Sequence, residues 1–242
     1  MKNFDNTSTL MEANPTSIGL AMSLSSRSHV LTERIARIQQ VAAVMTVAKI
    51  ARSVTVTIEN TFGTSGSGVL INRKENVYTV LTAHCVVEKT GIQYTIGTHT
   101  GNKYAVTKAI NLPQRHNEPY LALVQFSSPN TYLVAPLGSS DNAPIGADIY
   151  VAGYPCSMDT RTKDFEFTNG MIIDRPTKEL LHYSAPIGSG MSGAPVFNAT
   201  SQVIAIHLTR EVDRESGTPI EVAVPVHDAI ALLNGDATEL LL

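Results

Sequence analysis

A serine among glycines and a histidine at the end of a short apolar segment are the residues of this chain best suited to chemistry. Ser192 lies in Gly-Ser-Gly-Met-Ser-Gly-Ala-Pro-Val-Phe at 188–197, and His84 lies in Leu-Thr-Ala-His-Cys-Val at 81–86. A serine hydroxyl becomes a good nucleophile when a neighbouring imidazole accepts its proton. The flanking glycines let backbone N–H groups turn toward a developing oxyanion. The two segments therefore predict acyl transfer, most simply peptide-bond hydrolysis.

The elements that must position these residues are short and β-rich. Many short strands with turn signals between them predict two packed β-barrels. The seam falls at Ser128–Gly138, so that His84 and Ser192 belong to different barrels and the active site lies in the cleft between them. The predicted strands are Val54–Ile58, Val69–Ile71, Tyr78–Leu81, Tyr94–Ile96, Leu121–Phe126, Asp148–Ala152, Phe165–Thr168, Gly170–Ile173, Leu181–Ser184, Ala194–Phe197, Gln202–His207 and Glu221–Val224.

The two ends of the chain have a different pattern. Residues 1–30 are polar and rich in Ser, Thr and Asn, which predicts a flexible tail. Apolar residues at three- and four-residue steps predict a helix from Thr32 to about Ala51, packed on the back of a barrel; a cleavable pro-segment is the alternative. Val226–Leu233 predicts a short C-terminal helix. We expect a tail-and-helix segment over 1–45 and a catalytic domain over 46–242, with barrels at about 50–130 and 136–225.

The motifs resemble those of the trypsin/chymotrypsin superfamily of serine proteases. Thr82–Cys85 is similar to Thr-Ala-Ala/Gly-His-Cys but one small residue shorter, and Gly190–Pro195 is similar to Gly-Asp-Ser-Gly-Gly-Pro. Gly66–Ile71 and Val203–His207 resemble strands of the bacterial, glutamyl-endopeptidase-like branch. The resemblance covers about residues 53–233. It implies an all-β fold of two packed six-stranded antiparallel β-barrels, with an N-terminal helix or tail and a short C-terminal helix.

The resemblance also implies roles for individual residues. Ser192 would be the nucleophile of a serine endopeptidase and His84 its general base. The backbone N–H groups of Gly190 and Ser192 would form the oxyanion hole. The reaction passes through an acyl-enzyme and requires no cofactor, and no metal-ligand cluster stands out in the sequence.

The third member of the triad is altered. The family has Asp before an apolar strand, where this chain has Tyr120 in Tyr-Leu-Ala-Leu-Val. A neutral phenol would stabilise little charge on an imidazolium. Glu118 is two residues earlier, on the same strand face by alternation, so either Glu118 substitutes or a weakened Ser–His dyad operates. The alternative function is a catalytically weak or inactive protease-like module that binds peptides or protein partners.

The resemblance places the substrate pocket along Ile187, His207, Leu208 and Thr209. The histidine that matches His207 lines the S1 pocket of glutamyl endopeptidases, and a protonated or hydrogen-bonding imidazole suits a carboxylate. Those enzymes have Thr where this chain has Ile187, so acidic and small apolar P1 residues both stay open. Met191 replaces the Asp that pairs with a new N-terminus in trypsin, which argues against activation of that kind.

The composition limits the partners. The chain has 242 residues, 16% of them charged, a net charge of −3 and no Trp, so neither a basic patch nor a stacking platform for nucleic acid is expected. We expect a peptide or protein substrate and no membrane partner. Residues 1–30 lack the apolar core of a signal peptide, which favours a cytoplasmic location; a periplasmic or secreted one stays open. Cys85 and Cys156 are interpreted as two free, buried thiols, with a bridge between them left open.

Overall fold

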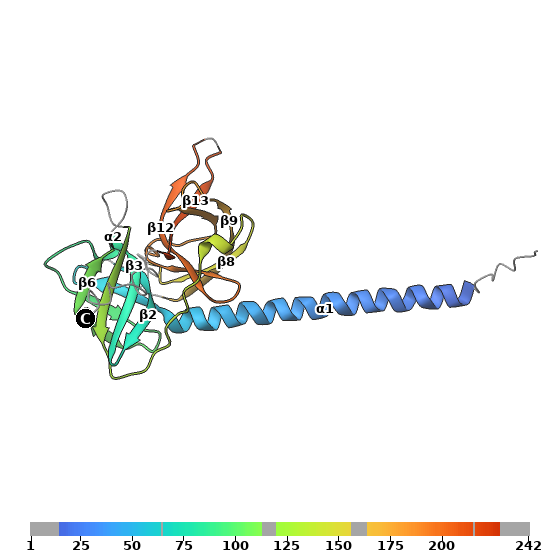
Figure 1. Cartoon of the computed structure of the whole chain (residues 1–242), viewed down its shortest axis with the longest axis horizontal. Helices are drawn as coiled ribbons and strands as arrows, with labels where there is room; N and C mark the ends of the chain where they lie inside the picture. Colours follow the sequence, from blue (N-terminus) through green and yellow to red (C-terminus); the bar gives the residue numbers. More distant parts are fainter. Residues whose placement is uncertain (1–14, 64, 113–119, 156–163, 215, 228–242) are drawn as a thin grey trace, which may run out of the picture. The chain divides into compact units, whose positions relative to one another are not determined.

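The computed structural model describes residues 15–63, 65–112, 120–155, 164–214 and 216–227 (Figure 1). The chain divides into two compact units, Met1–Ala43 and Val44–Leu242. Glu118, Cys156 and residues 228–233 of the predicted C-terminal helix lie outside the described residues.

The helix α1 runs from Pro15 to Val54 and is longer than predicted. Residues 15–30, predicted to belong to a flexible tail, are helical. Pro15 suits a first helical turn because its missing N–H would have no partner there, and no other proline follows before the strands begin. The prediction failed because a Ser-rich composition lowers helix propensity only slightly. Within the described residues no helix, α1 included, is both long and apolar enough to span a bilayer.

The first barrel is a seven-stranded antiparallel sheet in the order β5-β4-β1-β2-β3-β7-β6. Its alternating, β-branched strands were predicted, whereas β5 and β6 were missed because they are short and exposed and follow no alternation. The elements are β1 (Thr55–Asn60), β2 (Ser65–Lys74), β3 (Val77–Ala83), α2 (His84–Val87), β4 (Tyr94–Gly97), β5 (Lys103–Ala105), β6 (Lys108–Asn111) and β7 (Leu121–Ser127).

The second barrel closes fully, in the order β10-β13-β12-β11-β8-β9. The two strands predicted at 165–168 and 170–173 form the single strand β9. The elements are η1 (Ser140–Asn142), β8 (Asp148–Gly153), β9 (Glu166–Asp174), β10 (Leu181–Ser184), β11 (Pro195–Asn198), β12 (Val203–Val212) and β13 (Pro219–Pro225). The predicted all-β, two-barrel, trypsin-like fold is confirmed, with the first sheet open between β5 and β6.

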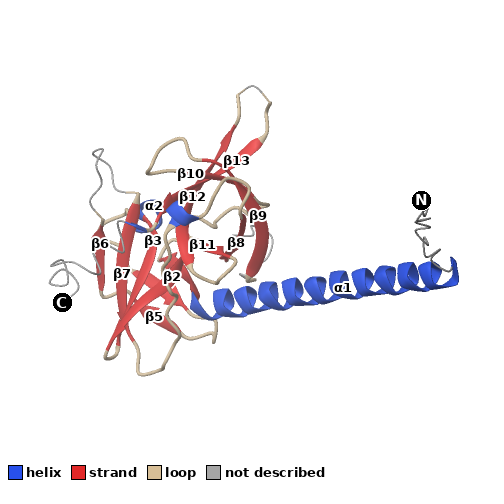
Figure 2. Ribbon diagram, turned by 45° about the vertical axis from the view of Figure 1, so that its right-hand side comes forward, coloured by secondary structure: helices blue, strands red, loops and turns tan. Residues whose placement is uncertain are grey.

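One apolar core joins the two barrels. It combines Leu81 and Leu121 of the first sheet with Phe197 and Val203 of the second. The last turns of α1 contribute to the same core through buried side chains, among them Val54. Figure 2 shows the sheet and the closed barrel side by side. This shared core fixes the end of β3, where α2 begins, against the segment that carries Ser192.

Candidate active site

The segment around Ser192 is a pair of tight turns that only glycine permits. Gly190 and Gly193 have φ angles of 85° and 84°, in the left-handed region that disfavours side chains. The amide of Gly193 donates to the His207 carbonyl at 2.8 Å, and the Ser67 amide donates to the Ser192 carbonyl at 2.8 Å. A Cβ on Gly193 would overlap the Ser67 carbonyl oxygen. The two glycines therefore let the serine segment lie directly on β2.

The amides predicted to form the oxyanion hole are available. In the part of the chain that the structure describes, neither the Gly190 nor the Ser192 N–H donates a hydrogen bond. Both belong to the turn that carries Ser192, and both residues line the pocket. A developing oxyanion needs such preorganised donors. Their role in an oxyanion hole stays a prediction.

The Ser192 hydroxyl already has a hydrogen-bond partner, which is not His84. Its Oγ donates to the Leu208 carbonyl at 3.1 Å. The Cys85 thiol lies near Ser192: partial desolvation of the thiol and the Glu88 carboxylate raise its pKa, and the neighbouring Ser192 side chain offsets part of that shift. Among the described residues, the His84 imidazole forms no hydrogen bond with Ser192. His84 as general base therefore stays a prediction.

The start of α2 is fixed by contacts on both sides of the histidine motif. Thr82 is fixed in β3, where its Oγ1 donates to the Ser67 carbonyl at 2.7 Å. The amide of His84 donates to the Tyr120 carbonyl at 2.8 Å. His84 and Cys85 therefore open α2 directly after β3, and Cys85 lies near Ser192.

Tyr120 lies beside His84 through its backbone. Its half-buried ring packs against the core shared by the two barrels. Among the described residues no hydrogen bond joins the Tyr120 hydroxyl to the His84 imidazole. The structure therefore brings Tyr120 and His84 together without showing the side-chain contact that a triad uses.

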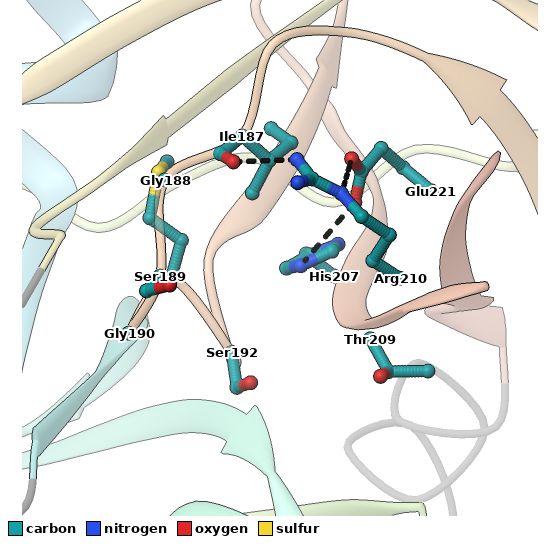
Figure 3. Close-up of a pocket in the computed structure, with 10 residues that line it drawn as sticks. Ile187, Gly188, Ser189, Gly190, Ser192, His207, Thr209, Arg210 and Glu221 are labelled. Carbon is teal, nitrogen blue, oxygen red and sulfur yellow. Dashed lines mark hydrogen bonds and ion pairs between the residues drawn. The ribbon is translucent and has the colours of Figure 1, made fainter. Parts of the chain in front are cut away.

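A pocket of about 220 Å³ opens next to Ser192 (Figure 3). Three of the residues predicted to bind substrate, Ile187, His207 and Thr209, line it, and Leu208 contributes the carbonyl that accepts from Ser192. The lining residues are Ile187, Gly188, Ser189, Gly190, Met191, Ser192, His207, Thr209, Arg210 and Glu221.

Of the two expected forms of His207, protonated or hydrogen-bonding, the lowered pKa favours the neutral, hydrogen-bonding imidazole at pH 7. Burial, assisted by the Arg210 charge, lowers the pKa of His207 to about 4. Burial also raises the pKa of Tyr183, whose hydroxyl lies 2.8 Å from the His207 Nδ1. A protonated Tyr183 hydroxyl donates to the Nδ1 of a neutral imidazole, so the ring proton is on Nε2. That nitrogen faces the Glu221 Oε2 at 3.9 Å.

Arg210 and Glu221 also line the pocket and were not predicted from the sequence. Figure 3 shows Arg210 reaching from β12 toward Ile187 and Glu221. Its Nε donates to the Glu221 Oε1 and its Nη2 to the Ile187 carbonyl, both at 2.6 Å. The Glu221 side chain is 2% exposed, and its Oε2 has no hydrogen-bond partner among the described residues. The sequence signal that could have indicated Arg210 is its position three residues after His207 on the same strand.

Comparison with known proteins identifies the fold family. The family model of the trypsin-like peptidase domain matches residues 28–206. The chain belongs to the trypsin-like peptidase family. The predicted superfamily is therefore confirmed, whereas the glutamyl-endopeptidase-like branch stays a prediction.

Two curated relatives of this peptidase-family chain are named as serine proteases. It is 26% identical to the Do-like serine protease HtrB of Bacillus subtilis (strain 168) over 193 residues, which is 70% of this chain and 40% of the relative. It is 34% identical to a candidate serine protease, HhoA of Synechocystis sp., over 121 residues, which is 47% of this chain and 30% of the relative. The chain thus matches less than half the length of either relative.

Two further residues separate this peptidase domain from trypsin itself. Met191, where trypsin-like zymogens were expected to have Asp, is 1% exposed and packs in the core of the second barrel. Cys85 is a free thiol but is exposed, so the expectation that it is buried was wrong. It lies in the first turn of α2 at the edge of the site and not inside a barrel.

Proposed function

We propose that this chain is a serine endopeptidase with Ser192 as nucleophile and His84 as general base. The observation that carries the proposal is the position of Ser192 at an open pocket, on a turn whose Gly190 and Ser192 N–H groups donate no hydrogen bond within the described residues. The hydroxyl leaves the Leu208 carbonyl, transfers its proton to His84 and attacks the substrate carbonyl. The amides of Gly190 and Ser192 stabilise the oxyanion, His84 protonates the leaving amine, and water then hydrolyses the acyl-enzyme.

Turnover is expected to be slow because Tyr120 replaces the usual aspartate. In serine proteases with this triad, loss of that carboxylate's function lowers turnover by a factor of about 10⁴. Glu118 is the residue proposed to compensate. If it does, Glu118→Gln lowers peptide hydrolysis well below the wild-type rate, whereas equal rates leave a Ser–His dyad.

A second candidate function is a peptide-binding module without catalysis. The observation that favours it is that the Ser192 hydroxyl donates to the Leu208 carbonyl and not to a base, with the Cys85 thiol nearby. Because the surroundings raise the pKa of Cys85, the neutral thiol predominates at pH 7, and a neutral thiol does not accept the serine proton. The two candidates share the pocket and differ in whether Ser192 reacts.

Labelling with a fluorophosphonate probe separates the two candidates. We expect the wild type to label, Ser192→Ala to be silent and His84→Ala to label at least 100-fold more slowly, since general-base catalysis contributes about 10²–10⁴. His182→Ala is the matched control, because His182 lies on β10 outside the pocket lining. A folded wild type that does not label supports the binding module. Labelling that survives His84→Ala removes His84 as the base.

For substrate class, we propose peptides or proteins with an acidic P1 residue. The relatives' names as serine proteases support a peptide substrate. In the pocket His207 is neutral, and the cationic group is the Arg210 guanidinium, with the Glu221 carboxylate bound to its Nε. A P1 carboxylate entering the pocket meets the exposed part of Arg210, whereas a P1 lysine would have to displace it from Glu221.

Peptide binding to Ser192→Ala tests this preference without requiring catalysis. We expect a peptide with P1 Glu to bind at least tenfold tighter than its P1 Gln or P1 Lys counterpart, and Arg210→Gln with Glu221→Gln to remove that difference. The double variant avoids leaving the buried Glu221 carboxylate unpaired. Tighter binding of the lysine peptide would contradict an acidic preference.

A further inference from the structure

The middle of α1 exposes a continuous stripe of large apolar side chains. Leu31, Ile35, Ile38 and Met45 are 59%, 48%, 68% and 67% exposed, and Ala42 is exposed between the last two. These residues follow one another at steps of four, three, four and three. Such spacing places all five on one face of a helix.

The stripe has the width and period of a coiled-coil seam. Leu31, Ile38 and Met45 are seven residues apart, as are Ile35 and Ala42. Apolar residues at two positions in seven form a narrow seam that fits another helix, whereas a face packed on a globular surface is wider. In the sequence the same spacing continues toward the start of α1 at Ala21, Leu24 and Ser28.

The helix also needs a partner for physical reasons. Residues 29–43 of α1 are exposed at every position. A helix gains most of its stability from burial of an apolar face, and unpacked helices are only marginally stable in water. Isolated exposed apolar residues are common on protein surfaces, but a repeating row of them marks an interaction site.

We propose that α1 pairs through this stripe with α1 of a second copy of the chain, as a parallel two-stranded coiled coil. Each stripe would bury the other, with Ile35 and Ala42 at one core position of the heptad and Leu31, Ile38 and Met45 at the other. Parallel pairing places Arg34 of one helix next to the uncharged Gln39 of its partner, so no like charges meet at the flank. Val41, which lies beside the stripe, adds apolar contact along one edge of the paired helices.

Sedimentation velocity of the full chain over a concentration series tests the pairing. We expect a species of twice the 26.0 kDa chain mass, and a rise of at least 100-fold in the dissociation constant for Ile35→Glu with Ile38→Glu. The matched control is Ala36→Glu with Gln40→Glu, which adds the same charge at exposed positions outside the stripe. Circular dichroism of each variant confirms that the β domain is folded. A monomeric wild type at all concentrations, a trimer, or equal loss of pairing in both double variants would overturn the proposal.

A disulfide cross-link tests the orientation. In a chain with Cys85→Ser and Cys156→Ser, Ala42→Cys should form a disulfide-linked dimer on mild oxidation, because equivalent core positions face each other in a parallel pair. Gln40→Cys, outside the stripe, is the control and should stay uncross-linked. Efficient cross-linking of both variants, or of the control alone, would contradict the parallel arrangement.

Discussion

At the scale of single residues, the reactivity of Ser192 depends on the start of α2, which follows β3 directly and carries His84 and Cys85. Thr82 is anchored to the Ser67 carbonyl, and the polypeptide enters α2 two residues later. Since the Ser192 hydroxyl donates to the Leu208 carbonyl and not to His84, catalysis requires it to exchange its Leu208 partner for the imidazole. The reactivity of Ser192 therefore depends on how easily the first turn of α2 rearranges.

The buried histidine predicts an acid-sensitive fold. The pKa of His207 is lowered to about 4, so between pH 6.5 and pH 4 folded His207 binds fewer protons than unfolded His207. Its contribution to stability is fully present above pH 6.5 and is lost as the pH falls toward 4. The groups that face it are Tyr183, Arg210 and Glu221. Urea unfolding should show the wild type losing up to about 3 kcal/mol more than His207→Gln between pH 7 and pH 4.

The raised pKa of Glu221 acts in the opposite sense, because protonation of that buried carboxyl favours the folded state. Glu221 is present in both the wild type and His207→Gln. The difference in stability between the two proteins therefore reports the contribution of His207. Parallel pH profiles for both would contradict a neutral, buried imidazole.

Residue types and spacing were sufficient to predict that Ile187, His207 and Thr209 lie near Ser192, and all four line one pocket, whereas their roles and that of His84 stay predictions. The charge state of His207 was not predictable, because it depends on burial and on Arg210 in the folded barrel. That Cys85 lies near Ser192 was equally unpredictable, because it depends on how α2 packs in the folded chain.

At the scale of elements, the serine segment functions only if it lies close to β2. Gly193→Ala should therefore destabilise the protein by about 1–3 kcal/mol beyond the cost of a left-handed alanine, because the new Cβ overlaps the Ser67 carbonyl. Thermal unfolding measures the loss, and fluorophosphonate labelling of Ser192 should fall with it as the segment moves away from β2.

Gly101→Ala is the matched control for that substitution. Gly101 has a φ of 84°, the same as Gly193, but a Cβ there would meet no atom within 4 Å. It carries the backbone strain without the collision. Equal destabilisation by the two substitutions would show that the close approach to β2 contributes nothing.

The strand at Val54–Ile58 was predicted from alternation with period two, and the strands that lead to the site from short β-rich runs between turn residues. All seven residues of β7 pair in register with β3, and both strands read as apolar runs in the sequence. β5 and β6 escaped prediction since each lies at an edge of the sheet with little burial. The first half of α1 was not predicted because its polar, Ser-rich composition resembles that of a tail.

At the scale of the whole molecule, two barrels share one core, and the segment between them is bonded to both. Ala135 donates to the Leu70 carbonyl at 2.7 Å, and Gly138 donates to the Val203 carbonyl at 2.8 Å. The segment predicted to join the barrels, Ser128–Gly138, is thus hydrogen-bonded to both of them. The number of strands indicated two barrels, but which residues form the shared core depends on the packing between them and could not be derived from local patterns.

The proposed boundary between a tail-and-helix segment at 1–45 and a catalytic domain at 46–242 leads to the last prediction. Removal of residues 1–45 should leave a domain that unfolds cooperatively and keeps its Ser192 reactivity, because Val47, Ala51 and Val54 stay in the shared core at 1%, 0% and 0% exposure. Removal of residues 1–54 deletes those three side chains and opens the core between the barrels. Since each large apolar side chain lost from a core costs about 2–5 kcal/mol, the shorter domain should unfold or precipitate. Circular dichroism during thermal unfolding compares the two truncations; a shorter domain as stable as the longer one would show that α1 contributes nothing to the barrels.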